Sequence, residues 1–209
     1  MFITFEGGEG SGKSTQVGLL KNTLEAAGRA CLVTREPGGT ESAERIRALL
    51  VSGDKDAWHP LSETLLFYAA RLEHVHKCIL PALTAGKIVL CDRFADSTRV
   101  YQGVGKQVSS QFIESLHQLT LQDFEPDLTF ILDIDPKQGL ARAAGRGDHE
   151  NRFESMEFTF HQQVRQGFLD IAATDTQRCV VIDAAKPPQA VHQDILQALR
   201  QHADMEPAL

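Results

Sequence analysis

Hydrophobic residues fall into five short runs along the chain, and longer segments with helical spacing lie between them. The runs are Phe2–Glu6, Ala30–Arg35, Lys87–Asp92, Asp127–Asp133 and Cys179–Asp183. They are mostly apolar rather than alternating, which is typical of parallel strands that are covered on both faces. The pattern therefore predicts a parallel sheet of five buried strands.

Helical spacing recurs in the segments between these runs. Intervals of three and four residues separate Val17, Leu20, Leu24 and Ala27, which predicts an amphipathic helix ending near Gly28. We expect further helices at Glu41–Val51, Leu61–Leu83, Lys137–Ala144, Ser155–Ala173 and Pro188–Gln201, and another helical region between Asp92 and Asp127. The second of these helices should pack through the stripe Leu61, Leu65, Ala69 and Leu72.

Alternating strands and helices predict an α/β fold in which helices flank a parallel sheet. The chain has no internal repeat or linker, so we expect one domain over residues 1–209. Ligands of such sheets bind beyond the carboxyl ends of the strands, and the residues there are the candidates for chemistry.

Charge and cysteine content narrow the class of protein. The 28 acidic and 21 basic residues give a net charge of −7, which disfavours a general nucleic-acid binder but allows a site for a small anion. Four cysteines without a CxxC pair indicate reduced thiols, and the eight histidines show no metal-ligand spacing. Neither a signal peptide nor a run of ~18 apolar residues is present. We expect a cytoplasmic protein without a membrane or nucleic-acid partner.

The segment after the first strand matches the phosphate-loop pattern G-x-x-x-x-G-K-[ST]. It consists of Gly7, Gly8, Glu9, Gly10, Ser11, Gly12, Lys13, Ser14 and Thr15. Glycines let backbone N–H groups face a phosphate, and the helix that follows adds its positive end. Lys13 would contact the β- and γ-phosphates, and Ser14 would hold Mg²⁺. This pattern predicts nucleoside triphosphate binding without choosing among kinases, GTPases and ATPases.

Two features of the sequence restrict that choice. No Asn-Lys-x-Asp loop is present to recognise guanine, which argues against a GTPase. Glu9 places a carboxylate within an anion-binding loop, where it would oppose a phosphate. Glu9 therefore points either to solvent or to another group, such as a sugar hydroxyl.

Four more motifs follow in the order that bacterial thymidylate kinases show. They are REPGGT at residues 35–40, FYAAR at 67–71, Asp92-Arg93 and Tyr101-Gln102-Gly103. With the phosphate loop they make nearly the whole chain resemble that family. Phe67 and Arg71 share a helical face that would suit a flat heterocycle, but the residues alone favour a core position for Phe67 and a solvated one for Arg71. Asp92-Arg93 alternatively forms a strand-end ion pair.

The resemblance implies a three-layer P-loop nucleoside monophosphate kinase fold and the reaction ATP + dTMP → ADP + dTDP. It implies that Phe67 stacks on thymine, that Arg71 donates to its O4 atom and that Arg47 binds the monophosphate. Further contacts to dTMP are implied for Glu9, Glu36, Pro37, Arg93, Ser97, Tyr101 and Gln102. Mg²⁺ would be held by Ser14 and Asp92, and the family is usually homodimeric.

The resemblance also implies a lid at about residues 145–155. Gly10 stands where some members of the family carry a phosphate-loop arginine, so Arg146 and Arg152 of the lid are expected to join Lys13 and Arg93 in catalysis. The adenine is expected near the loop Ala184–Pro188. The implied site then carries a net charge of +3, which leaves −10 for the rest of the chain.

Two other functions remain open at this stage. The chain could be a P-loop kinase for a different monophosphate or for a deoxynucleoside. It could also be a nucleotide-dependent switch that hydrolyses ATP slowly and binds a protein partner.

Overall fold

The computed structural model describes residues 1–54, 56–144 and 152–202. Among them, five parallel strands form one sheet in the order β2-β3-β1-β4-β5. The strands are β1 (Phe2–Glu6), β2 (Cys31–Arg35), β3 (Ile88–Asp92), β4 (Leu128–Asp133) and β5 (Cys179–Asp183). The expected sheet is confirmed, and each strand agrees with its predicted range to within one residue.

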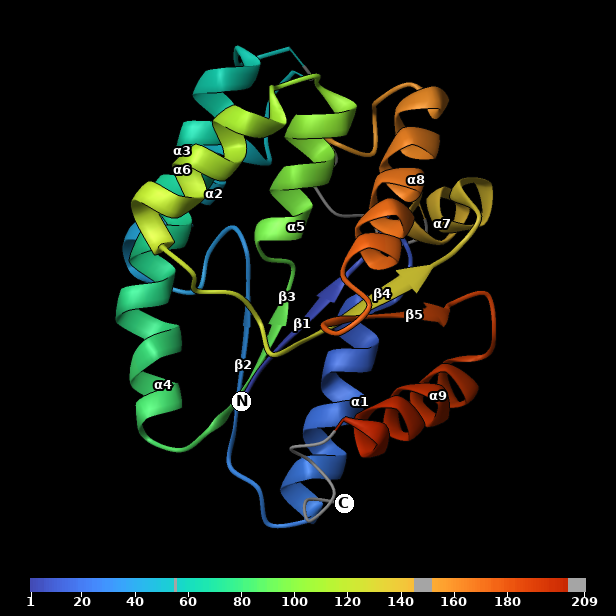
Figure 1. Ribbon diagram of the computed structural model, residues 1–209. Coiled ribbons are helices and arrows are strands. Elements are labelled where there is room, and N and C mark those ends of the chain that lie inside the picture. Colours follow the sequence, from blue (N-terminus) through green and yellow to red (C-terminus); the bar gives the residue numbers. More distant parts are fainter. Residues whose placement is uncertain (55, 145–151, 203–209) are drawn as a thin grey trace.

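Helices cover both faces of the sheet, which gives three layers (Figure 1). The α-helices are α1 (Lys13–Ala26), α2 (Glu41–Leu50), α3 (Pro60–His74), α4 (Leu80–Thr84), α5 (Ala95–Thr98), α6 (Ser110–Leu121), α7 (Pro136–Ala144), α8 (Phe158–Thr174) and α9 (Pro188–Gln201). Two segments are π-helical, η1 (Val75–Ile79) and η2 (Arg99–Gly105). No helix in the described part of the chain is long and apolar enough to cross a bilayer.

Alternate residues of each strand enter different layers of the core. Ile3 and Phe5 of β1 pack with α1 and α9 on one face, whereas Phe2 packs on the other face with α3 and α6. A third cluster joins η2 and α8 to Ile131 of β4. Both faces of the central strand are therefore buried, which explains why its sequence is apolar without alternation.

The predicted helix Leu61–Leu83 is not a single α-helix. It consists of α3, η1 and α4, which follow each other without a break. Pro81 explains the difference, because a proline has no N–H to donate and its ring displaces the carbonyl group four residues earlier. The wider π-turn just before Pro81 accommodates both effects.

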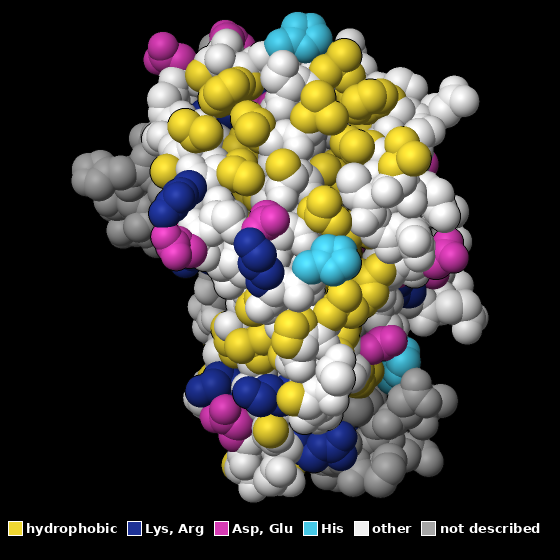
Figure 2. Space-filling model, turned by 90° about the vertical axis from the view of Figure 1, so that its left-hand side faces the viewer, with side chains coloured by type: hydrophobic (Ala, Val, Ile, Leu, Met, Phe, Trp, Pro, Cys, Tyr) yellow, Lys and Arg dark blue, Asp and Glu magenta, His cyan; other side chains and the backbone are white. Residues whose placement is uncertain are grey.

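The helix α3 was expected to pack through Leu61, Leu65, Ala69 and Leu72. This prediction is wrong for the first three, which are exposed, whereas Leu72 packs against the core. Leu61 and Leu65 are 41% and 49% exposed, because Tyr68 and Arg71 occupy the inner face of the helix. Figure 2 shows hydrophobic side chains gathered on the side of the molecule that carries α3 and α6.

Candidate active site

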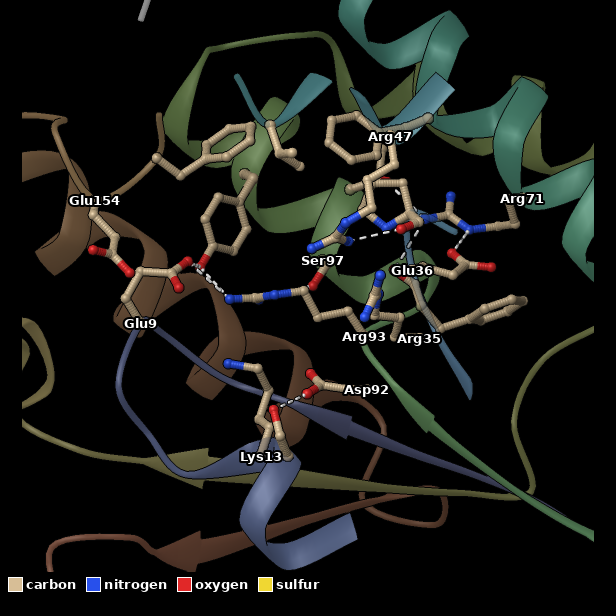
Figure 3. A pocket seen from close by; sticks show the side chains of 18 of the residues that line it. Glu9, Lys13, Arg35, Glu36, Arg47, Arg71, Asp92, Arg93, Ser97 and Glu154 are labelled. Atoms are coloured by element: carbon tan, nitrogen blue, oxygen red, sulfur yellow. Dashed lines mark hydrogen bonds and ion pairs between the residues drawn. The ribbon is translucent and has the colours of Figure 1, made fainter. Parts of the chain in front are cut away.

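A cavity of about 440 Å³ opens at the carboxyl edge of the sheet, between the phosphate loop, α2, α3 and η2. The strand register aligns Arg35 with Asp92 and Asp92 with Phe5, so the segments that follow β1, β2 and β3 meet at this edge. All ten residues expected to contact dTMP line this first cavity, namely Glu9, Glu36, Pro37, Arg47, Phe67, Arg71, Arg93, Ser97, Tyr101 and Gln102. Figure 3 shows how several of them converge.

The phosphate loop connects β1 to α1 in a conformation that requires glycine. Gly10 has φ 65°, and a Cβ atom there would lie 1.9 Å from the carbonyl oxygen of Gly139. Lys13 bends back over the loop, and its Nζ donates to the carbonyl oxygens of Gly8 at 2.9 Å and Gly7 at 3.2 Å. The phosphate loop is therefore hydrogen-bonded to the side chain of Lys13, which is the first residue of α1.

Ser14 and Asp92, the pair expected to hold Mg²⁺, are in direct contact. The Ser14 hydroxyl donates to Asp92 Oδ2 at 2.7 Å. No group of three or more His, Cys, Asp or Glu side chains in the described residues could hold a metal ion by itself. A hydroxyl and a single carboxylate suit Mg²⁺, which keeps water ligands and takes further oxygens from substrate phosphates.

Arg93 lies at the centre of the charged end of the cavity. It has φ 71°, a left-handed conformation that turns its side chain back towards the phosphate loop. Its Nη1 donates to the Gly7 carbonyl at 3.0 Å and to Ser97 Oγ at 3.1 Å, and its Nη2 donates to Glu9 Oε1 at 2.8 Å and Tyr101 Oη at 3.0 Å. Tyr101 in turn donates to Glu9 Oε1 at 2.8 Å.

Glu9 therefore points into the cavity and not to solvent (Figure 3). Burial alone would raise its pKa, but the positive charges of Arg93 and Lys13 outweigh burial and lower the pKa to about 2. Burial, and then the charge of Arg93, lowers the pKa of Lys13 to about 8. The carboxylate of Glu9 is thus ionised and neutralised by cations, which removes its conflict with a phosphate.

Arg71 lies at the other end of the cavity and is 2% exposed, so it is not a solvated helix charge. Glu36 accepts from Arg71 Nε at 2.7 Å and is also bonded to His74 Nδ1 at 2.9 Å. Nη2 of Arg71 donates to the Phe94 carbonyl and to Thr98 Oγ1, both at 3.0 Å. Nη1 is buried and has no hydrogen-bond partner in the described structure.

An unpaired guanidinium N–H in a cavity wall indicates a missing acceptor, because leaving such a group unsatisfied costs ~1–3 kcal/mol or more. Phe67 lies one helical turn from Arg71 and also lines the cavity. Its ring centroid is 6.3 Å from that of Phe153. This end of the cavity thus places the Phe67 ring beside the Nη1 donor of Arg71. A flat heterocycle that carries a carbonyl oxygen could stack on the ring and accept from the donor.

The structure adds cavity residues that the sequence reasoning missed. Thr98 lies beside Arg71, while Ser97, the residue expected near the base, has its hydroxyl 2.6 Å from Glu6 Oε2. Phe153 and Glu154 also line the cavity. The position of Thr98, one helical turn before Gln102, was the available signal for it, whereas Phe153 follows the expected lid arginines without any spacing that would identify it.

Of the two arginines expected in the lid, Arg146 and Arg152, only Arg152 lies in the described part of the chain. Arg146 lies outside the described residues. Arg152 is 2% exposed and does not line the first cavity. It forms an ion pair with Glu63 at 2.6 Å and donates to the carbonyl oxygens of Leu50 and Asp54. Its expected role at the transferred phosphate stays a prediction.

A second cavity of about 470 Å³ lies on the other side of the phosphate loop. Its lining includes Arg142 and the loop Ala184–Pro188, where the sequence suggested that adenine binds. Arg142 donates to the carbonyl oxygens of Ala184 and Ala185. Gly10, Gly12 and Thr15 line both cavities, so the phosphate loop stands between them.

The chain is similar in sequence and in fold to proteins of one family. The sequence profile of a family described as Thymidylate kinase matches residues 5–195. The chain is 52% identical over 190 residues to the thymidylate kinase of Caulobacter vibrioides, covering 91% of each chain. It is 48% identical over 202 residues to that of Ruegeria pomeroyi, covering 97% of this chain and 95% of the other. The crystal structure of thymidylate kinase from Ehrlichia chaffeensis matches with a TM-score of 0.78 and 38% identity, over 95% of this chain and 98% of the other.

Proposed function

Since the chain belongs to the thymidylate kinase family, we propose that its first cavity binds dTMP and that the phosphate loop and second cavity bind Mg-ATP. Thymidylate kinases phosphorylate dTMP to dTDP with ATP as the phosphoryl donor, and this is the reaction of the chain. Arg146 and Arg152 belong to this proposal as lid cations.

One observation carries the proposal. The phosphate loop lies between two cavities and contributes Gly10, Gly12 and Thr15 to both. A hydrolytic switch needs only one nucleotide site next to this loop, whereas a phosphotransferase needs a donor site and an acceptor site that meet there. The unpaired Nη1 of Arg71 and the nearby Phe67 ring favour an acceptor whose base is flat and carries a carbonyl oxygen.

The reaction needs positioning and charge neutralisation more than proton transfer. The attacking phosphate oxygen of dTMP is already anionic near neutral pH, so no general base is required. Lys13 and Arg93 line the first cavity beside the phosphate loop, and they would neutralise the charge that develops on the transferred phosphoryl group. Arg47 also lines the first cavity and would bind the phosphate of dTMP.

Mg²⁺ would be held by the Ser14 hydroxyl and Asp92, directly or through water, together with phosphate oxygens of ATP. When bound, it neutralises part of the charge on the β- and γ-phosphates. Ser14 Oγ and Asp92 Oδ2 lie 2.7 Å apart, so the two oxygen ligands are adjacent.

A substrate panel tests the proposal. We expect ATP turnover to depend strictly on an added monophosphate, and dTMP to be the best acceptor among dTMP, dUMP, dCMP, dGMP and UMP. Turnover of ATP without an acceptor would favour the switch, and a preference for another monophosphate would favour a related kinase.

We further propose that the protein is a homodimer in the cytoplasm. Leu61 and Leu65 of α3 are exposed, and Leu119 of α6 is 83% exposed. Figure 2 shows hydrophobic side chains gathered on the side of the molecule that carries these two helices. Apolar patches of this kind favour a second copy as partner. The four free thiols fit a reducing compartment. Sedimentation of the Leu65→Glu and Leu119→Glu variants tests the dimer, since either should shift the protein towards monomer.

A further inference from the structure

A buried glutamate on α3 lies behind the wall of the first cavity and outside the proposed catalytic groups. Glu63 is 0% exposed and does not line the cavity. It precedes Phe67 by four residues and Arg71 by eight, so the three side chains share one face of the helix. Its position alone indicates that it supports the end of the cavity where the base would bind.

The two oxygens of Glu63 have different partners. Oε2 is paired with two cations, Lys106 at 2.9 Å and Arg152 at 2.6 Å. Oε1 accepts a hydrogen bond from Nε2 of Gln102 at 2.9 Å. The oxygens of a carboxylate in an ion pair act as acceptors, so Oε1 requires a donor as its partner.

This arrangement fixes which atom of Gln102 a ligand meets. Gln102 is 1% exposed and lines the cavity, and its NH₂ group is turned towards Glu63. No residue in the described part of the chain donates a hydrogen bond to its amide oxygen. The oxygen is therefore the polar side-chain atom of Gln102 that has no partner in the described part of the chain, and it is an acceptor that a ligand can use.

An acceptor at this place selects among nucleobases. Apart from its phosphate, dTMP carries two donors, the imide N3–H and the 3′-hydroxyl. Glu9 and Tyr101 form the sugar end of the cavity. Gln102 comes four residues after Thr98, which is hydrogen-bonded to Arg71, and this places Gln102 at the base end. Cytosine carries a lone pair on N3 in place of the N–H group, so it would face the Gln102 oxygen with a second acceptor.

We propose that Glu63 is a positioning residue which locks the Gln102 amide with its oxygen towards the base, and that this lock contributes to the selection of dTMP over dCMP. The inference rests on the proposed function, because it assigns a base-selecting element to the same cavity. Glu63 acts only through Gln102 and does not touch the substrate.

The test compares Glu63→Gln with the wild type in steady-state kinetics with dTMP, dCMP and ATP. A neutral amide at position 63 can donate or accept, so Gln102 is free to turn its NH₂ group towards the base. We expect KM for dTMP to rise about tenfold and the preference of kcat/KM for dTMP over dCMP to fall about tenfold, with KM for ATP within about twofold.

A double-mutant cycle separates positioning from a structural role. If Glu63 acts through Gln102, the Glu63→Gln/Gln102→Met protein has the same KM for dTMP as Gln102→Met alone. Glu114→Gln is the matched control, because it removes an ion pair with Arg99 on the surface and neither residue lines the cavity. It should leave unchanged both KM for dTMP and the preference for dTMP over dCMP. Glu63→Asp, which keeps the charge but withdraws the carboxylate, takes the place of Glu63→Gln if that variant does not fold.

Three results would overturn the inference. The first is an unchanged preference of Glu63→Gln for dTMP over dCMP, and the second is an equal rise of KM for dTMP and KM for ATP. The third is additive effects of the two substitutions on KM for dTMP in the double variant. The wild-type protein in the same assay keeps the two claims apart. If it does not phosphorylate dTMP, the proposed function fails, and if it does so while Glu63→Gln behaves like the wild type, only the role of Glu63 fails.

Discussion

Arg93 and Arg71 lie at opposite ends of the first cavity and differ in how many of their N–H groups are hydrogen-bonded within the protein. Both Nη atoms of Arg93 are engaged within the protein, by the Gly7 carbonyl, Ser97, Glu9 and Tyr101. Arg71 is held through Nε and Nη2, and its Nη1 has no partner in the described structure. The Nη atoms of Arg93 can contact a phosphate only by sharing or exchanging partners, whereas Nη1 of Arg71 gains a partner that it lacks.

The proposed function explains this difference by the group that each end would bind. A transferred phosphoryl group changes its charge distribution during the reaction, and a cation already paired with Glu9 can shift towards it as that charge develops. A base does not change during the reaction, so a rigid donor with one open position is sufficient. We therefore expect changes at Arg93 to lower kcat and changes at Arg71 to raise KM.

The largest effect is expected at the charged end. Arg93→Ala and Lys13→Met should each lower kcat about 10³-fold or more, because transition-state charge loses its neutralising partner. A coupled assay for ADP measures the rate, and circular dichroism checks the fold. Arg45→Ala serves as control, since Arg45 pairs with Glu41 on the surface. Wild-type-like turnover by folded Arg93→Ala protein would remove Arg93 from the mechanism.

A smaller effect with a different signature is expected at the base end. Arg71→Ala should raise KM for dTMP about 10- to 100-fold and leave KM for ATP within about twofold. It also leaves the buried carboxylate of Glu36 without its cation, which should destabilise the fold by ~3–5 kcal/mol. The Arg71→Ala/Glu36→Gln double variant should regain stability without regaining affinity for dTMP. Equal increases in both KM values would show that Arg71 does not contact the base.

The pH dependence provides a third test, specific to the charged end. The pKa of Lys13 is lowered from 10.5 to about 8, mainly by burial, so Lys13 loses its proton as the pH rises through about 8. We expect kcat/KM for ATP to fall by up to about tenfold per pH unit above that value. Lys13→Arg should show low activity without this decline, because arginine stays charged. A flat wild-type profile up to pH 10 would contradict the assignment.

The smallest expected effect concerns the free energy of unfolding and its dependence on the protonation of Glu6. Burial, and then the charge of Asp96, raises the pKa of Glu6 to about 7, while Glu6 accepts hydrogen bonds from Phe94 N and Ser97 Oγ. Between about pH 4.5 and pH 7 the folded state holds a proton that the unfolded state has lost, so stability falls as the pH rises. The change is at most ~3 kcal/mol. Urea unfolding at pH 5 and pH 7.5 measures it, and Glu6→Gln should flatten the dependence.

The sequence by itself determined the strands, most of the helices and the phosphate loop. Each depends on local properties that hold wherever the chain folds, namely apolar runs, helical spacing and glycines at positions that a side chain cannot occupy. The motifs at residues 35–40 and 92–93 could be assigned to one cavity because parallel strands place their carboxyl ends at a common edge. The motif at residues 67–71 lies within a helix, and only the resemblance to thymidylate kinases assigned it to the same cavity.

Only the tertiary structure decided which side chains are paired inside that cavity. The direction of Glu9, the exposure of Leu61 and Leu65, and the burial of Arg152 against Glu63 depend on contacts between residues far apart in the sequence. The π-helical segment η2 brings Tyr101 to Glu9 and its neighbour Gln102 to Glu63, and no local pattern predicted that turn. The physical reason is that the orientation of a charged side chain depends on the partner with which it pairs. That partner is brought near only when the chain folds.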